Sequence, residues 1–61
     1  MTKQEARNYF KLKDTDVVYK DGILSVKRSA EQLLKVWSIS SDTKEKCNIE
    51  IEACEALLKD L

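Results

Sequence analysis

The chain has 61 residues, of which 43% are hydrophobic and 36% are charged, so its composition is that of a globular domain and excludes a disordered tail. Its formal net charge is zero, and it contains neither an apolar run long enough to span a membrane nor a signal-peptide core. Only one core fits in this length, so we expect a single small domain that covers residues 1–61 and resides in the cytoplasm, with no membrane partner.

The charges are unevenly distributed along the chain. Residues 1–28 hold seven basic and four acidic side chains, whereas residues 29–61 hold four basic and seven acidic ones. This asymmetry predicts a local basic surface in the first half or an electrostatic attraction between the two halves of the fold.

A short helix is predicted near the start of the chain, at residues 3–12. Thr2 followed by Glu5 matches a capping box, and the apolar residues Ala6 and Phe10 lie four positions apart, on one face of a helix.

A β-hairpin is predicted over residues 17–26. Two β-prone runs flank Asp21 and Gly22, the residue pair preferred in a type I′ turn, where both central residues have positive φ. With this pair in the turn, one face of the hairpin carries the apolar side chains of Val17, Tyr19, Leu24 and Val26.

Two more helices are predicted, at residues 30–38 and 42–60. The first follows Ser29 and Gln32, which match a second capping box, and has the stripe Ala30, Leu33, Leu34 and Trp37. The second has a stripe with alternating spacings of four and three, formed by Cys47, Ile51, Cys54, Leu58 and Leu61.

These elements predict an α+β fold in the order α-β-β-α-α, a two-stranded antiparallel hairpin packed against three helices. The predicted core consists of Ala6, Phe10, Val17, Tyr19, Leu24, Val26, Leu33, Leu34, Trp37, Cys47, Ile51, Cys54, Leu58 and Leu61.

Residues that could support catalysis are scarce. The chain has no histidine and only one glycine, which excludes histidine chemistry and a glycine-rich phosphate loop. Cys47 and Cys54 would lie two helical turns and about 10 Å apart, too far for a disulfide, as expected of a protein in a reducing compartment. We therefore expect no enzymatic activity, no metal, no cofactor and no small-molecule substrate.

The favoured function is that of a small regulatory or accessory protein that binds a larger protein or a second copy of itself. The apolar stripe of the last predicted helix is longer than one short helix and a hairpin can cover, and acidic side chains flank it. An open edge of the hairpin is a further possible docking site. The candidate protein-binding residues are Ile49, Glu45, Glu52, Ala56, Ile23 and Val18.

A second hypothesis comes from the N-terminal segment. Its Thr-x-x-Glu-Ala-x-x-Tyr-Phe pattern, residues 2–10, resembles the opening helix of excisionase-type winged-helix proteins, which direct site-specific recombination in phages and transposons. The resemblance implies that residues 17–26 form the wing, and it suggests a phage or mobile element as the source. The family's recognition helix has no counterpart, because only residues 13–16 lie in its place. In this alternative the chain binds DNA phosphates through Lys3, Arg7, Lys20, Lys27 and Arg28.

Overall fold

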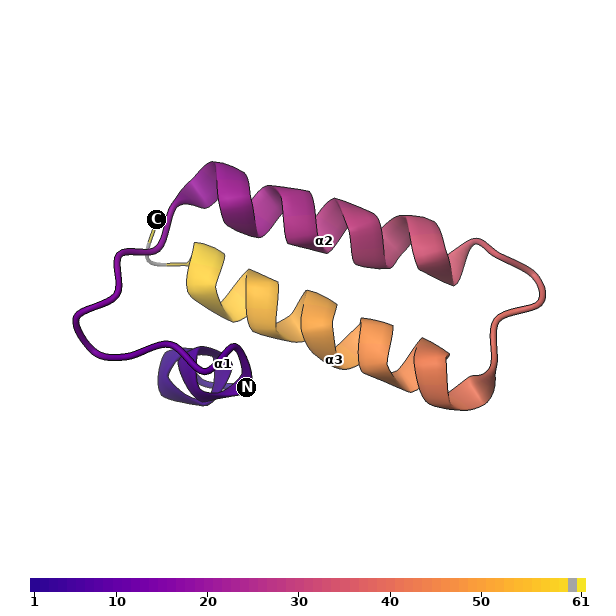
Figure 1. Ribbon diagram of the computed structural model, residues 1–61, viewed down its shortest axis with the longest axis horizontal. Coiled ribbons are helices and arrows are strands. Elements are labelled where there is room, and N and C mark those ends of the chain that lie inside the picture. Colours follow the sequence, from indigo (N-terminus) through magenta and orange to yellow (C-terminus); the bar gives the residue numbers. More distant parts are fainter. Residues whose placement is uncertain (60) are drawn as a thin grey trace.

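The computed structural model describes residues 1–59 and 61 and contains three helices: α1 (Lys3–Tyr9), α2 (Lys20–Leu34) and α3 (Ser41–Leu58). Helices α2 and α3 form an antiparallel hairpin, and α1 crosses α3 near one end of it (Figure 1). The molecule is elongated, with extents of 38 × 19 × 16 Å.

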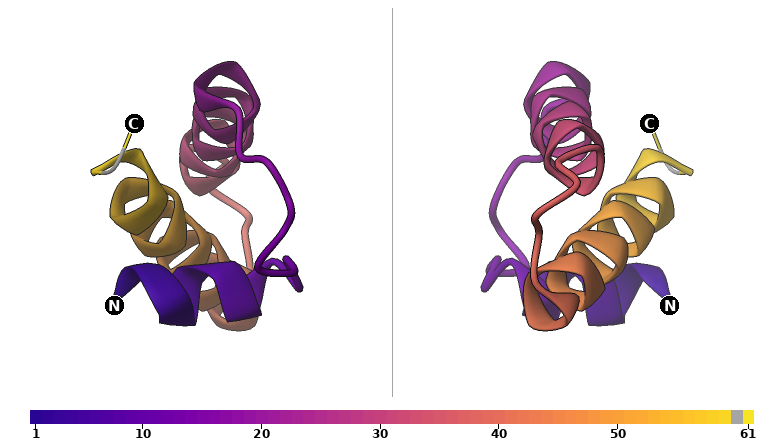
Figure 2. Two further views of the ribbon diagram at one scale, coloured as in Figure 1. Left: turned by 90° about the vertical axis from the view of Figure 1, so that its left-hand side faces the viewer. Right: turned by 90° about the vertical axis from the view of Figure 1, so that its right-hand side faces the viewer.

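Helix α3 is the centre of the fold. It packs against α2 along one side and against α1 on another, and within the described residues α1 and α2 do not pack against each other. The end-on views show α1 and α2 on different sides of α3 (Figure 2). The three helices therefore form no closed bundle, and much of α2 is left uncovered.

The predicted α+β fold is wrong, because the described part of the chain contains no strand. The predicted hairpin at residues 17–26 is replaced by the start of α2, which begins at Lys20. Gly22 does not have the positive φ that a type I′ turn requires, and it lies with Asp21 in the first turn of the helix.

Three features favour helix α2 over a hairpin. The side chains of Ile23, Ala30 and Leu34 recur at helical spacing and are buried or half-buried in the structure. Asp21 lies in the first turn, where the helix dipole stabilises a negative charge. A two-stranded hairpin alone is marginally stable in water, whereas a long helix can pack along the whole of α3. Packing therefore overrides the β-propensity of the individual residues.

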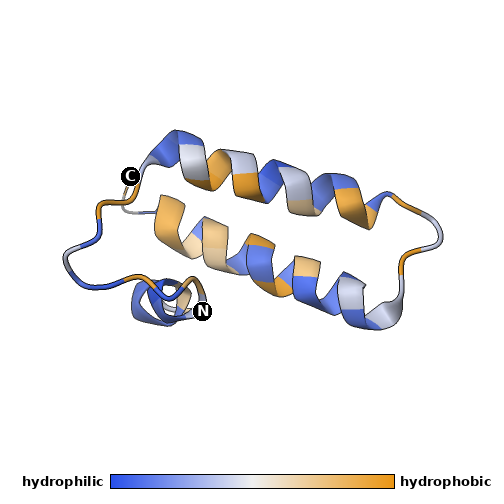
Figure 3. Cartoon of the chain, in the orientation of Figure 1, coloured by the Kyte–Doolittle hydropathy of each residue, from blue (hydrophilic) through white to orange (hydrophobic). Residues whose placement is uncertain are grey.

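Of the helix predicted at residues 30–38, only residues 30–34 are helical, and they form the last third of α2, which ends at Leu34. Ser29 lies inside this helix and does not cap it. Figure 3 shows the hydrophobic residues of α2 gathered toward α3, and further hydrophobic residues in the segments just before and just after α2.

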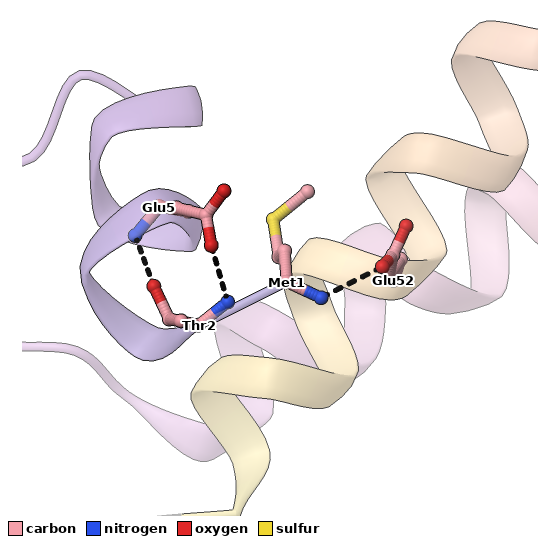
Figure 4. A network of polar contacts seen from close by, with 4 residues as sticks. All are labelled: Met1, Thr2, Glu5 and Glu52. Carbon is pink, nitrogen blue, oxygen red and sulfur yellow. Dashed lines mark hydrogen bonds and ion pairs between the residues drawn. The ribbon is translucent and has the colours of Figure 1, made fainter.

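Helix α1 has the predicted capping box. The hydroxyl of Thr2 accepts a hydrogen bond from the backbone N–H of Glu5 at 3.1 Å, and the Glu5 carboxylate accepts one from the N–H of Thr2 at 2.9 Å (Figure 4). The helix ends at Tyr9, three residues before the predicted end.

The C-terminus of α1 is closed by a Schellman motif. The N–H of Lys11 donates to the carbonyl of Asn8 at 3.0 Å, and the N–H of Leu12 donates to the carbonyl of Arg7 at 2.9 Å. Lys11 takes the left-handed conformation, with φ 58°, that reverses the chain direction. The reversal brings Leu12 back against the core beside Ala6.

Helix α3 is capped by Ser40, whose hydroxyl accepts a hydrogen bond from the N–H of Thr43 at 3.2 Å. It begins one residue before the predicted start, and its predicted end at residue 60 lies outside the described residues.

The core is built from small side chains. The buried hydrophobic residues of the described chain are Ala6, Ala30, Cys47, Ala53, Cys54, Ala56 and Leu57. The exposed surface of 4676 Å² exceeds, by about 600 Å², the roughly 4,000 Å² expected of a compact folded chain of this size. Larger apolar side chains must therefore lie partly or fully outside the core.

Six residues of the predicted core are exposed, namely Val17, Tyr19, Leu24, Leu33, Trp37 and Leu61. For Val17, Tyr19 and Leu24 the reason is that the predicted hairpin face does not exist, and Trp37 lies beyond the end of α2. Phe10, Val26, Leu34, Ile51 and Leu58 are half-buried. No helix of the described chain combines the length and apolar character needed to cross a membrane.

Candidate protein-binding surface

An apolar groove of about 290 Å³ lies beside the first half of α2. It is slightly smaller than the 300–1,000 Å³ typical of small-molecule sites, and its size suits one or two side chains of a partner. Its lining is formed by Phe10, Leu12, Val17, Val18, Tyr19, Gly22, Ile23 and Val26.

Hydrogen bonds fold the segment that forms one wall of this groove. The Arg7 guanidinium donates to the backbone carbonyls of Lys13 and Asp16, which ties the connecting segment to α1. The Asp16 carboxylate accepts a further bond from the N–H of Lys13 at 2.7 Å. Val17 follows directly and is 70% exposed, so this wall presents apolar surface to solvent.

Tyr19 has an unusual position at the start of α2. It is the N-cap residue, with extended φ and ψ, but its side chain makes no capping hydrogen bond. The corresponding residues of the other helices, Thr2 and Ser40, both cap with a hydroxyl. The Tyr19 side chain is 72% exposed at the groove. Local stability would favour Ser, Thr, Asp or Asn here, and such departures are typical of functional positions.

A second exposed apolar cluster lies at the opposite end of α2. We call it the tip, and it consists of Leu33, Val36 and Trp37. Trp37 belongs to the loop between α2 and α3 and is 95% exposed. An indole so fully in water contributes almost nothing to the fold by burial.

The groove and the tip are joined by a face of α2 without charges. At 100° per residue, all five charged residues of the helix fall within about 120° of its circumference. They are Lys20, Asp21, Lys27, Arg28 and Glu31. The opposite side holds what we call the uncharged strip: Gly22, Ser25, Val26, Ser29, Gln32 and Leu33, all exposed except the half-buried Val26.

The predicted protein-binding residues are not brought together. Ile23 and Val18 line the groove. Ala56 is buried in the cluster that includes Ala6 of α1, and Ile49 is half-buried. Helix α1 thus covers a side of α3 that the sequence pattern had placed outside the core.

The two acidic residues of that prediction also lie on α3. Glu45 is exposed, and Glu52 accepts a hydrogen bond from the Met1 amino group at 2.7 Å (Figure 4). The residues that the prediction missed are Tyr19 and Trp37, both assigned to the core. The lack of a capping side chain before α2 was the available sequence signal for Tyr19.

The predicted DNA-binding residues are divided between two helices on different sides of α3. Lys3 and Arg7 lie on α1, and the Arg7 guanidinium is used to hold the connecting segment. The other three lie on α2, where Lys27 pairs with Glu55 at 3.7 Å. The wing that the excisionase resemblance implied is wrong, because residues 20–26 are helical.

The thiols are free and buried. Burial, together with the nearby charge of Glu50, raises the pKa of Cys54, so the protonated and weakly nucleophilic form is favoured at neutral pH. Within the described residues, no three Cys, Asp or Glu side chains cluster closely enough to hold a metal ion.

No protein-family model, curated protein or solved structure matches this chain. The groove, the uncharged strip and the tip together form what we call the α2 surface.

Proposed function

We propose that this chain is a small, non-enzymatic regulatory or accessory protein of the cytoplasm that acts by binding a partner chain, either a larger protein or a second copy of itself, through the α2 surface. The cytoplasmic assignment is supported by the two free, buried thiols.

The observation that carries the proposal is the distribution of apolar side chains. The buried hydrophobic residues of the described chain are alanines, cysteines and one leucine, whereas Tyr19 and Trp37 are largely exposed. Tyrosine and tryptophan are the residues most often found at the energetic centres of protein interfaces. They lie just beyond the two ends of α2, so a single partner that lies along this helix can contact both.

The dimensions and chemistry of the α2 surface also favour a protein ligand. The groove accommodates one or two apolar side chains, and the adjoining strip offers hydroxyl and amide groups without charge. Protein interfaces combine an apolar centre depleted of charge with polar groups that form hydrogen bonds. DNA binding is not part of this proposal, because the five predicted basic residues are divided between α1 and α2, on different sides of α3.

Two leucines of α2 provide a matched test. Leu33 lies in the α2 surface and is 43% exposed, whereas Leu24 lies among the charged residues and is 37% exposed. We expect Leu33→Ala to reduce co-purification of a stoichiometric partner from source cells at least about tenfold. We expect Leu24→Ala to leave it unchanged, with similar folding of both variants by circular dichroism.

Equal effects of the two substitutions would contradict the assignment of binding to this face. A Trp37→Ala variant with full partner recovery would do so as well, since it removes the most exposed aromatic side chain of the surface.

A further inference from the structure

We propose that the occupant of the α2 surface is a second copy of this chain. The two α2 helices pack antiparallel about a two-fold axis, and Trp37 of each copy enters the groove of the other. This inference rests on the proposed function, because it assigns a particular partner to the same surface.

The positions along α2 fit such an arrangement. With the axis near Ser29 and Ala30, Gly22 of one copy lies about 11 Å from the axis, at 1.5 Å per residue, and faces the end of the other copy's α2. Trp37 follows that end in the loop, three residues after Leu34, and enters the groove from there. In the same register Val26 lies opposite Leu33. Two-fold symmetry repeats each contact, so the groove and the tip of both copies are used.

The sizes of the opposing groups are complementary. Trp37 is the largest exposed side chain of the tip, and the groove of about 290 Å³ lies at the glycine that it would face. A Cβ placed on Gly22 would meet no atom within 4 Å, so there is open space at this position. Ser29, near the axis, is small enough for the two helices to approach closely.

The charges permit this contact. The uncharged strip has no charged side chain along its length, although 36% of the chain is charged. The net charge of zero adds no overall repulsion between copies. Two identical surfaces normally oppose like charges near the axis, and this face of α2 avoids that penalty.

The excess exposed area of the whole chain is of the size that one copy buries in a small dimer. A standard interface buries about 800 Å² on each partner, and weaker ones bury about 600 Å². The chain exposes about 600 Å² more than a compact chain of its size. An aromatic side chain that becomes buried contributes about 150–250 Å² of this area. We therefore expect a dimer in equilibrium with monomer at micromolar concentration.

Because Trp37 is the only tryptophan of the chain, its fluorescence reports the contact directly. Sedimentation equilibrium of the full chain should show a monomer–dimer transition, and the emission maximum should shift to shorter wavelength over the same concentrations. Gly22→Leu fills the groove and Trp37→Ala removes the inserted side chain, so each should weaken the dimer by about tenfold or more. Leu24→Ala, on the charged side of α2, should dimerise like the unchanged chain.

Mixing the two variants gives the decisive measurement. The Trp37→Ala chain keeps its groove and the Gly22→Leu chain keeps its tryptophan, so a mixed dimer recovers one of the two contacts. Adding the tryptophan-free chain to the Gly22→Leu chain should therefore shift the remaining fluorescence to shorter wavelength. Leu33→Lys, which places charge on the strip, should also prevent dimerisation, and it covers the case in which Gly22→Leu does not fold.

A chain that stays monomeric at 1 mM, or a mixture without a fluorescence shift, would overturn the dimer. Species that grow beyond a dimer would also overturn it, because head-to-tail contacts do not close. Co-purification of a different protein, lost in Leu33→Ala, would still support the proposed function. If that protein is also absent, both proposals fail.

Discussion

Cys54 has the largest side chain that is fully enclosed in the described chain, and this burial changes the pKa of its thiol. Burial raises the pKa of its thiol above the ordinary value of 9.0, and the carboxylates of Glu50 and Glu55 add to the effect, whereas Lys27 opposes it. A neutral thiol is therefore part of the folded state, and ionisation favours unfolding.

This raised pKa predicts a loss of stability in alkali. The contribution is fully present below the unfolded thiol's pKa of 9.0, and the free energy of unfolding falls as the pH rises above that value. The slope from one group has an upper limit of about 1.4 kcal/mol per pH unit. Urea unfolding measured at pH 7, 8.5 and 10 should show this decrease in the free energy of unfolding.

The control for this experiment is Cys54→Ala. The pKa of Tyr9 is also raised, chiefly by burial and in smaller part by the charges of Glu50, Cys47 and Cys54, so the difference between the two chains reports Cys54 together with its small effect on Tyr9. Identical pH profiles for the two chains would show that Cys54 is not the group responsible.

The sequence predicted a helix end correctly where the cap is formed by residues close together in the chain. The Thr2 and Glu5 pair is present as a capping box because both partners lie within one turn. The same pattern at Ser29 and Gln32 has no capping role, because these residues lie inside α2. A local motif cannot reveal that a helix has already begun ten residues earlier.

At the scale of the element, α2 is the helix that sequence reasoning missed. Asp21 and Gly22 fit a tight turn and the first turn of a helix equally well, so the choice depends on what lies beside them. The partner is α3, whose last turns, some thirty residues further along the chain, pack against Ile23, and this contact decides for the helix. The same error affected the prediction of the site, because Tyr19 was assigned to the apolar face of the predicted hairpin.

The missing cap of α2 predicts that the helix can be stabilised by one substitution. Tyr19→Ser supplies a hydroxyl where the backbone already has the extended N-cap conformation, and it should raise the free energy of unfolding by about 1 kcal/mol. Because Tyr19 lines the groove, the same change should weaken binding at the α2 surface.

Urea midpoints measure this gain in stability, provided that the slope of the unfolding transition does not change. Thr2→Ala is the comparison, and it should lower stability by about the same amount because it removes an existing cap. A midpoint for Tyr19→Ser at or below that of the unchanged chain would count against this account of α2.

At the scale of the whole molecule, the fold is three helices arranged around α3, with most large apolar side chains outside the core. The sequence predicted helices close to α1 and α3, but not that α1 would cover Ala53 and Ala56 of α3. That contact depends on small side chains, which give a weak hydrophobic pattern. Sequence reasoning therefore favoured larger residues such as Trp37 for the core.

Leu57, which was absent from the predicted core, is buried, whereas Trp37, which was assigned to that core, is exposed. This difference gives a test of the whole arrangement. Leu57 is the largest buried hydrophobic residue, so Leu57→Ala should cost about 2–5 kcal/mol. The total stability expected of 61 residues is only about 3–9 kcal/mol, so much of this variant should be unfolded. Trp37→Ala should change the stability of the monomer by less than about 0.5 kcal/mol.

Thermal unfolding by circular dichroism at low protein concentration distinguishes these outcomes. Low concentration matters because association through the α2 surface would add stability that depends on the amount of protein. A large decrease in the thermal stability of Trp37→Ala under these conditions would place the indole in the core.

The alanine contact between α1 and α3 has a consequence for how this protein can vary. Ala6 and Ala53 are both completely enclosed. Truncation of either side chain removes only one methyl group, and a larger side chain has no space. A methyl group added at either position would push α1 away from α3. At these two positions the fold is vulnerable to a larger side chain, whereas at Leu57 it is vulnerable to a smaller one. Random mutation should therefore be tolerated on the charged, exposed side of α2 and purged at Ala6 and Ala53.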